Sequence, residues 1–222
     1  MPPCPQFLCD KGAYFMTRLQ RTQKSILLGL CAAIFTLICA DGVQEDLAGK
    51  LTRLQIVANS DCEEDQALKI QVRDTVAAMA QSLTASCTDA GEAQEALEAA
   101  LVQIEDAAQR TVYRHSRVTP VKAQLENVYY PTRDYGSFRL PAGEYTALRI
   151  ILGAGEGQNW WCVAYPSLCT AAAGTQLERE ALKAGLDRDQ LRLITADGES
   201  VRIGFWLVDT VGRIRRLLQD FR

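Results

Sequence analysis

The chain has 222 residues, of which 48% are hydrophobic, enough for one globular domain with shorter appendages. Its net charge is −3, and without residues 1–40, which hold four basic residues and one acidic residue, the balance is −6. This acidity argues against nucleic acid as a partner, because binding phosphates needs a basic face. It also argues against general adsorption to anionic lipid.

Residues 16–40 have the pattern of a secretory signal. Arg18, Arg21 and Lys24 precede the uncharged run SILLGLCAAIFTLICA, which ends at Ala40 and is followed by polar DGVQED. As a helix this run would extend roughly 24 Å, at about 1.5 Å per residue, somewhat short for a membrane core of about 30 Å. We therefore expect a signal peptide cleaved after Ala40. An uncleaved N-terminal membrane anchor is the second interpretation and a buried core helix the third.

The first fifteen residues, MPPCPQFLCDKGAYF, show no hydrophobic periodicity and precede Met16, a natural start for the signal. We interpret residues 1–15 as a disordered extension or the product of a mis-assigned start codon. Residues 45–222 are then predicted to form a single domain.

Four cysteines lie in the predicted exported part: Cys62, Cys87, Cys162 and Cys169. Outside the cytosol an even number of cysteines favours disulfides, and three pairings are conceivable. Cys62 and Cys87 lie near opposite ends of one predicted helix, more than about 30 Å apart by its rise per residue, which is beyond disulfide reach. We favour Cys162 with Cys169, which leaves the other two free or paired elsewhere.

The domain begins with LTRLQIVA, residues 51–58, whose alternation predicts a strand. Ser60 with Glu63 matches a capping box, and Asp89 with Glu92 repeats the pattern. Each box should open an amphipathic helix. The first helix has its apolar face at Leu68, Val72, Val76, Met79 and Leu83, and the second at Ala93, Leu97, Leu101, Ile104, Ala108 and Val112.

The rest of the chain predicts mostly strands. They cover residues 118–129, 145–152 and 160–165, with turns at PTRDYG and PAGEY. A loose segment with some helix should follow at 171–188, then a hairpin at 191–203 and a last amphipathic helix through residues 207–221. We expect an α+β fold: a mainly antiparallel sheet, two amphipathic helices packed on one face, and a C-terminal amphipathic helix.

Several local patterns fall short of a chemical site. GAGEG at residues 153–157 lacks the G-x-G-x-x-G spacing and the following helix of a dinucleotide site, so positive φ at its three glycines is the simpler interpretation. His115 is the sole histidine, which excludes the common multi-histidine zinc sites, and it should end the second helix. The acidic NSDCEEDQ lacks a turn glycine for a cation loop. We predict no catalytic residues, no metal and no cofactor.

Trp160 and Trp161 are adjacent on a predicted strand, so their side chains should point to opposite faces. Core packing of both is the commoner outcome, and a contact surface is the alternative, since tryptophan is enriched at interface hot spots. The last helix has basic residues on and near its polar side: Arg213, Arg215, Arg216 and Arg222. It should dock on the sheet, with a membrane-surface role as the alternative. Membrane contact could thus come from residues 25–40 or from this helix.

Long stretches of the chain resemble the stage II sporulation protein R family of endospore-forming bacteria. They are LQIVANSDCEEDQALKIQVRD, YYPTRDYGSFRLPAGEYTALRIILGAGEGQNWWCVAYPSLC and the terminal apolar–basic helix. The resemblance implies export from the forespore into the space between the two sporulating membranes. It also implies activation there of a membrane-embedded aspartic protease, which processes a pro-sigma factor in the mother cell. The protein would be an intercellular signal and not an enzyme.

A secreted activator needs an exposed complementary patch, and we expect it where the glycine loop and the tryptophan strand meet the start of the first helix. The runner-up function is an extracytoplasmic cell-wall-binding module or hydrolase, with the tryptophans stacked on sugar. The partner-binding hypothesis comprises Asn59, Asp61, Asp65, Lys69, Arg73 and Asp74 as one polar group, and Tyr135, Asn159, Trp160 and Trp161 as the other.

Overall fold

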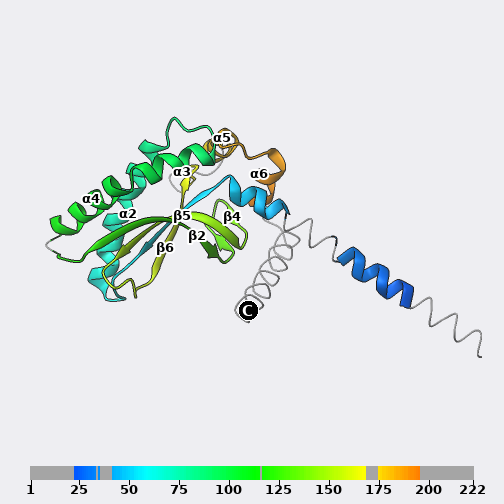
Figure 1. The fold of residues 1–222 in the computed structure, drawn as a ribbon, viewed down its shortest axis with the longest axis horizontal. Helices are drawn as coiled ribbons and strands as arrows, with labels where there is room; N and C mark the ends of the chain where they lie inside the picture. Colours follow the sequence, from blue (N-terminus) through cyan, green and yellow to red (C-terminus); the bar gives the residue numbers. More distant parts are fainter. Residues whose placement is uncertain (1–22, 34, 36–41, 116, 169–174, 196–222) are drawn as a thin grey trace, which may run out of the picture. The chain divides into compact units, whose positions relative to one another are not determined.

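The computed structural model describes residues 23–33, 35, 42–115, 117–168 and 175–195. The chain divides into two compact units, Met1–Val43 and Gln44–Arg222. In the first unit residues 23–33 are helical and exposed (Figure 1). None of the helices in the described ranges is both long and apolar enough to cross a bilayer. Residues 1–22, 34 and 36–41, and with them the predicted cleavage after Ala40, lie outside the described part.

The second unit is built on a four-stranded sheet in the order β2-β5-β1-β6. Its strands are β1 (Thr52–Val57), β2 (Val121–Tyr130), β5 (Gly143–Leu152) and β6 (Asn159–Tyr165). β2 with β5 and β1 with β6 pair antiparallel, whereas β1 with β5 pairs parallel. The predicted α+β class is confirmed, but the sheet is mixed. The helical connection after β1 leads into β2, which runs opposite to β1. The chain then reverses between β2 and β5, so β5 runs in the direction of β1 and pairs with it in parallel.

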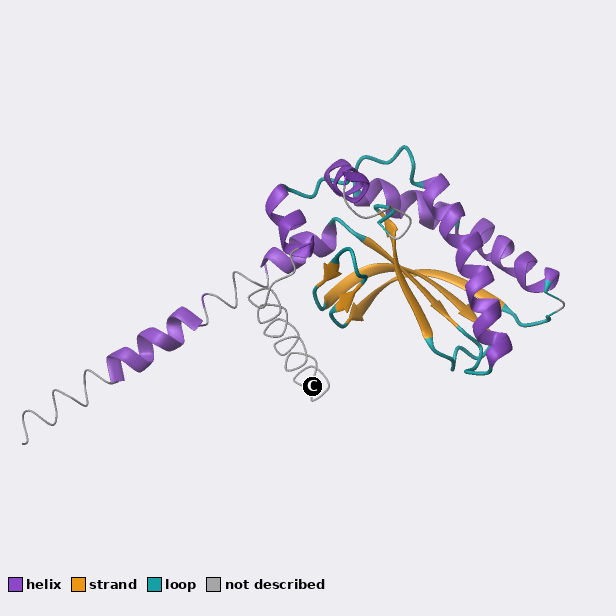
Figure 2. Cartoon of the chain, turned by 180° about the vertical axis from the view of Figure 1, so that it is seen from behind, coloured by secondary structure: helices purple, strands orange, loops and turns teal. Residues whose placement is uncertain are grey.

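Three helices cover one face of the sheet, as Figure 1 and the reverse view in Figure 2 show. They are α2 (Glu63–Leu83), α3 (Ala90–Ala99) and α4 (Leu101–Arg114). The second predicted helix is therefore two helices, broken at Ala100, where no glycine or proline marks the break. His115 caps the end of α4, as predicted.

One of the two predicted capping boxes is wrong. Asp89 caps α3 and its Oδ1 accepts a hydrogen bond from the Glu92 backbone N–H at 2.9 Å, as the pattern predicts. At the start of α2 the capping residue is instead Cys62, which makes no side-chain capping bond. The Ser60 hydroxyl donates to the Asp65 carboxylate at 2.7 Å. Ser60 therefore fixes the loop before α2 and does not cap the helix itself.

The sheet separates two apolar clusters. On the helix face Leu54 and Ile56 of β1 pack with α2, α3 and α4. On the opposite face a second cluster joins Tyr145 and Val163 to the segment around Leu47. Every residue of β1 is buried, because both faces of this central strand are covered.

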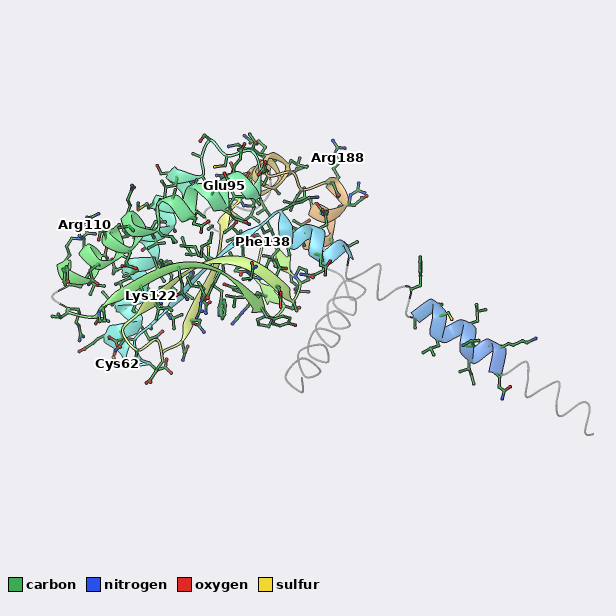
Figure 3. The ribbon with its side chains drawn as sticks, viewed as in Figure 1. Cys62, Glu95, Arg110, Lys122, Phe138 and Arg188 are labelled. Atoms are coloured by element: carbon green, nitrogen blue, oxygen red, sulfur yellow. The ribbon has the colours of Figure 1, made fainter. Side chains whose placement is uncertain are left out.

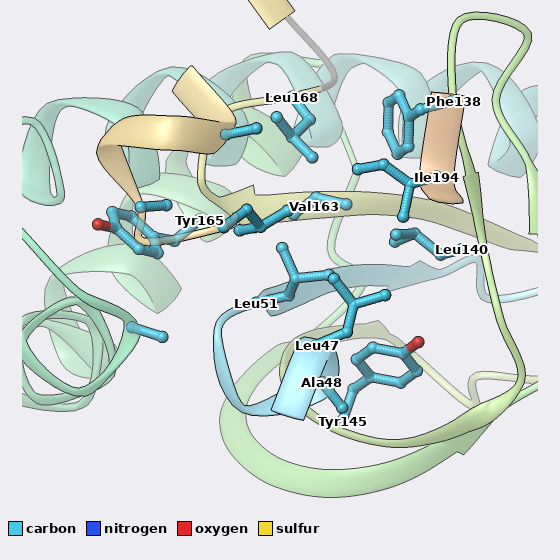
Figure 4. Packing of buried hydrophobic residues seen from close by; sticks show 14 of the residues in the cluster. Leu47, Ala48, Leu51, Phe138, Leu140, Tyr145, Val163, Tyr165, Leu168 and Ile194 are labelled. Atoms are coloured by element: carbon cyan, nitrogen blue, oxygen red, sulfur yellow. The ribbon is translucent and has the colours of Figure 1, made fainter. Parts of the chain in front are cut away.

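The second cluster is closed by a small hairpin and two short helices. The hairpin is β3 (Arg133–Asp134) with β4 (Arg139–Leu140), and the helices are α5 (Thr175–Lys183) and α6 (Arg188–Thr195). Figure 4 shows Ile194 of α6 beside Leu140 and Phe138 of the hairpin region. The predicted hairpin at 191–203 is wrong for residues 191–195, because Leu191 and Ile194 bury a helical face. Residues 196–203 and the predicted last helix lie outside the described part.

Helix α4 offers a matched test of this core. Ile104 is completely buried, whereas Val102, two residues earlier, is 74% exposed. We expect Ile104→Ala to lower the free energy of unfolding of the full chain by about 2–5 kcal/mol, because it leaves a cavity. Val102→Ala should change it by less than about 0.5 kcal/mol. Urea unfolding followed by tryptophan fluorescence measures both values, and equal losses would contradict the placement of α4.

Candidate functional site

The start of α2 holds the glycine loop that joins β5 to β6. Because β1 and β5 are parallel, both end at the same edge of the sheet, and the loops that follow them meet there. The backbone N–H of Ala154 donates to Asn59 Oδ1 at 3.0 Å, and that of Gln158 donates to Asp61 Oδ1 at 2.7 Å. The Gly157 N–H also donates to the Ala58 carbonyl oxygen at 2.9 Å. We call this set of contacts, between residues 58–69 and 153–158, the loop latch.

Two kinds of constraint explain the glycines in the latch. Gly153 and Gly155 have φ of 57° and 66°, as predicted. Gly157 does not adopt positive φ, so the prediction is wrong there. A Cβ at Gly157 would lie 2.3 Å from the Ser60 carbonyl oxygen, a backbone atom. Close approach of the two chains, and not φ, therefore requires this glycine.

Asp65 is the buried acceptor of the latch. It is 5% exposed and accepts hydrogen bonds from Ser60 Oγ and Asn59 Nδ2, both at 2.7 Å. These donors, Ser60 first and then Asn59, lower the pKa of the Asp65 carboxyl below its ordinary value of 3.8. The carboxylate therefore stays charged and fixes the loop before α2.

Lys69 joins the latch from the next turn of α2. Its ammonium donates to the Gln158 carbonyl oxygen at 2.9 Å and to Gln66 Oε1 at 2.5 Å. Burial lowers the pKa of Lys69, and the charge of Asp61 opposes that effect. Four predicted partner-binding residues, Asn59, Asp61, Asp65 and Lys69, thus make hydrogen bonds within the protein. Their contact with a partner stays a prediction.

The two tryptophans lie on opposite faces of β6, as predicted, and both are half-buried. Trp160 packs on the helix side, where the Arg73 guanidinium carbon lies 4.5 Å from its ring centroid. Arg73 also pairs with Asp74, Nη2 to Oδ1 at 2.6 Å. Trp161 packs on the other side, edge-to-face with Tyr130 at a centroid distance of 4.7 Å.

A buried arginine lies behind Trp161. Arg53 of β1 is completely buried, with its guanidinium carbon 4.2 Å from the Tyr130 ring centroid and 4.9 Å from that of Tyr145. Its Nη2 donates to the Tyr135 hydroxyl, which lies in the β3–β4 hairpin region. Burial raises the pKa of Tyr145 to about 12, so this ring stays neutral beside the cation. We call Arg53 with Tyr130, Tyr135 and Tyr145 the arginine cage.

The sequence pattern does not predict the arginine cage. The alternation of LTRLQIVA places Arg53 on the face opposite Leu54 and Ile56, which suggests solvent. The hairpin instead folds over that face and buries the side chain. The available signal was the density of tyrosines in YYPTRDYGSFRLPAGEY, which gives neutral rings that can surround a cation.

A groove of about 490 Å³ lies between the hairpin region and β6. Four residues of the partner-binding hypothesis, Tyr135, Asn159, Trp160 and Trp161, line it. Phe138, labelled in Figure 3, stacks on Tyr135 at a centroid distance of 4.7 Å. The structure thus brings the two predicted polar groups together, with the latch beside the groove. The remaining lining residues are Arg133, Asp134, Ser137, Phe138 and Leu168.

Of the four cysteines in the predicted exported part, the structure describes Cys62, Cys87 and Cys162. Cys62, at the start of α2 (Figure 3), is free and exposed, and Cys87 is free and buried. Burial raises the pKa of the Cys87 thiol. Cys169 lies outside the described residues, so its pairing with Cys162 stays a prediction. Within the described ranges no three histidine, cysteine or acidic side chains gather as a metal site.

The lowered pKa of Asp65 predicts pH-dependent stability. Because its pKa is lower in the folded state than in the unfolded state, the carboxylate stabilises the fold above the unfolded value. That contribution is lost as the pH falls through the folded value. We expect Asp65→Asn to lower the free energy of unfolding by about 1–3 kcal/mol at pH 7. The difference from wild type should shrink below about pH 4. Urea unfolding from pH 7 to pH 2.5 measures it.

Asp106→Asn is the control, since it removes an exposed carboxylate from α4. It should change the free energy of unfolding by less than about 0.5 kcal/mol at pH 7. A pH-independent loss in Asp65→Asn would contradict the role assigned to the carboxylate.

The sequence profile of the stage II sporulation protein R family matches residues 48–175, more than half of the chain. Stage II sporulation protein R of Bacillus subtilis (strain 168) is 34% identical over 156 residues, which cover 68% of this chain and 69% of that protein. No solved structure matches. The matched profile spans the sheet, helices α2 to α4, the latch, the cage and the groove. The chain belongs to the stage II sporulation protein R family.

Proposed function

We propose that this sporulation protein is an exported signal that acts by contact. It activates a membrane-embedded aspartic protease, and this leads to processing of a pro-sigma factor in the mother cell. The protein works in the space between forespore and mother cell, either secreted or held by its N-terminal segment, and it is not itself an enzyme. Its membership in the family supports the role in sporulation, and the apolar run after Lys24 supports export.

The groove between the hairpin and β6 is the observation that carries contact as the mode of action. Trp161, Tyr135 and Phe138 give it aromatic walls, and Arg133 and Asn159 add exposed polar groups at the surface. Aromatic and arginine side chains around a concave surface are typical of interface hot spots. The cage and the latch fix both walls from behind, so the surface is preorganised and little entropy is lost on docking.

Loss of the groove should abolish activation. We expect Trp161→Ala to reduce processing of the precursor by about tenfold or more, because a central aromatic contact contributes more than about 1.4 kcal/mol. The full chain, the candidate protease and the pro-sigma factor are co-expressed in a non-sporulating host, and cleavage is followed by immunoblot. The control is Tyr113→Ala, which removes an exposed aromatic side chain at the end of α4. The amount of processed precursor should stay within about twofold of that with the wild-type chain.

Circular dichroism and thermal unfolding of each variant separate loss of docking from loss of folding. Normal processing by a folded Trp161→Ala chain would overturn the groove as the docking surface. Processing that no longer needs the partner protease would overturn the function itself. Deletion of residues 25–40 should stop processing, because activation requires export.

A second candidate function uses the same aromatic rings. Tryptophan and tyrosine faces also stack on sugars, which fits a cell-wall-binding module or hydrolase. Incubation of the purified full chain with cell-wall sacculi distinguishes the two. Retention on the sacculi or release of fragments favours this candidate, whereas processing only with the protease favours the activator.

Export also implies oxidation, and we propose a disulfide between Cys162 and Cys169 in the exported protein. Digestion without reduction should yield one peptide pair that contains both residues, detected by mass spectrometry. Alkylation under denaturing, non-reducing conditions should label Cys62 and Cys87, which are free in the structure, and should leave Cys162 unlabelled. Labelling of Cys162 before reduction would contradict the pairing.

A further inference from the structure

We propose that the groove binds an extended segment of the partner protein that presents a carboxylate next to an aromatic or aliphatic side chain. The inference rests on the proposed docking function and specifies the chemistry of the segment that docks. It follows from an excess of hydrogen-bond donors in and behind the groove, from its apolar walls and from the edge of β6 at residues 159–161, which among the described strands pairs only with β1.

Arg133 supplies the accessible positive charge. Its guanidinium carbon lies 5.3 Å from the centroid of Trp161, and the side chain is exposed. It takes part in none of the ion pairs formed by the described residues. A guanidinium over an aromatic ring keeps its in-plane N–H groups available for an anion, and their fork matches a carboxylate.

Tyr135 supplies a second donor, and Arg53 is the reason. Arg53 Nη2 donates to the Tyr135 hydroxyl, so the tyrosine oxygen is an acceptor in that bond and keeps its own proton. The described residues offer this hydroxyl no acceptor. Tyr135 lines the groove, and the neighbouring cation makes its O–H a better donor. An anionic oxygen in the groove would satisfy it.

The buried arginine behind the groove adds further hydrogen-bond donors. Nε and Nη1 of Arg53 are buried donors without a hydrogen-bond partner among the described residues. Buried donors are ordinarily satisfied, so a group of them beside a groove indicates a missing acceptor or negative charge. The two tyrosine rings compensate only part of the Arg53 charge.

The charged acceptors near the groove already have donors, whereas the buried Gln55 Oε1 has none among the described residues. Asp134 pairs with Arg139 of the same hairpin, and Glu126 pairs with Arg149 in the sheet. Asn159 Oδ1 accepts from Gln55 Nε2 at 3.1 Å. These pairs leave Arg53 and Arg133 as uncompensated positive charges, in a chain whose net charge is −3. The local charge therefore complements an acidic group.

The walls and the edge define the rest of the segment. Half-buried Trp161 gives apolar surface beside the donors, over the buried Phe138 and Leu168, so a carboxylate alone would leave this ring uncovered. Among the described strands β6 pairs only with β1, and Asn159, Trp160 and Trp161 of this edge strand line the groove. An extended segment can lie along such an edge, with its side chains alternating between apolar wall and charge.

The test compares two probes that differ only in charge. N-acetylphenylalanine carries an aromatic ring next to a carboxylate, and N-acetylphenylalanine amide is its neutral counterpart. We expect the acid to shift the indole N–H signals of Trp160 and Trp161 in NMR titrations of the full chain. It should bind about five- to tenfold more tightly than the amide, as expected for a carboxylate paired with arginine.

Two variants assign the effect to the donors. Arg133→Gln removes the charge and keeps a polar side chain, and Tyr135→Phe removes only the hydroxyl. Each should abolish most of the preference for the acid. Arg110→Gln removes an exposed arginine from α4 (Figure 3) and should leave the preference unchanged. Equal binding of acid and amide to the wild-type chain would overturn the inference, as would an unchanged preference in both groove variants.

The processing assay keeps this inference separate from the function on which it rests. Arg133→Glu should reduce processing by about tenfold, because it places a like charge opposite the incoming carboxylate. Normal processing in Arg133→Glu together with lost processing in Trp161→Ala would overturn the carboxylate and leave the docking surface standing. Sedimentation completes the test: a dimer that Arg133→Gln dissociates would overturn the inference in favour of a second copy as the occupant.

Discussion

The burial of one cation organises the face of the sheet opposite helices α2, α3 and α4. Arg53 projects from the central strand β1 into a space enclosed by Tyr130 and Tyr145 and holds the hydroxyl of Tyr135. A buried guanidinium is costly unless hydrogen bonds and ring contacts replace its hydration. The hairpin region that carries Tyr135 is therefore held against the sheet. With the hairpin in place, Trp161, Phe138 and Leu168 enclose a groove instead of lying on an open surface.

The opposite wall depends on the latch. Asp65 orders Asn59 and Ser60, and Asn59 in turn accepts the backbone N–H of Ala154. Gly157 permits the loop to approach the backbone of Ser60, and Lys69 holds the Gln158 carbonyl oxygen immediately before β6. A loop rich in glycine is thereby fixed at both ends by the start of α2. The tryptophan pair consequently begins from a rigid position, which a preorganised contact surface requires.

Cage and latch together support the proposal that the protein acts by contact. Their charged groups are mostly used to fix backbone and rings, and the groove between them keeps donors that lack acceptors. Acidic partner segments suit this arrangement in spite of the negative charge of the whole chain, because the local balance around Arg53 and Arg133 is positive. Membership in the family connects the protein with sporulation. In the proposed function, the groove is the surface through which the protein signals to a protease in the adjacent membrane.

The sequence by itself determined the family, the α+β class, the strands β1, β5 and β6 and the opposite faces of the two tryptophans. Each of these follows from local periodicity or from long specific motifs. Only the tertiary structure decided the parallel pairing of β1 with β5, the break at Ala100, the helix at 188–195 and the burial of Arg53. Alternation along a strand shows which residues share a face, but it does not show what later covers that face. The hairpin that buries Arg53 lies about eighty residues further along the chain, and its contacts are set by non-local packing that no window of the sequence contains.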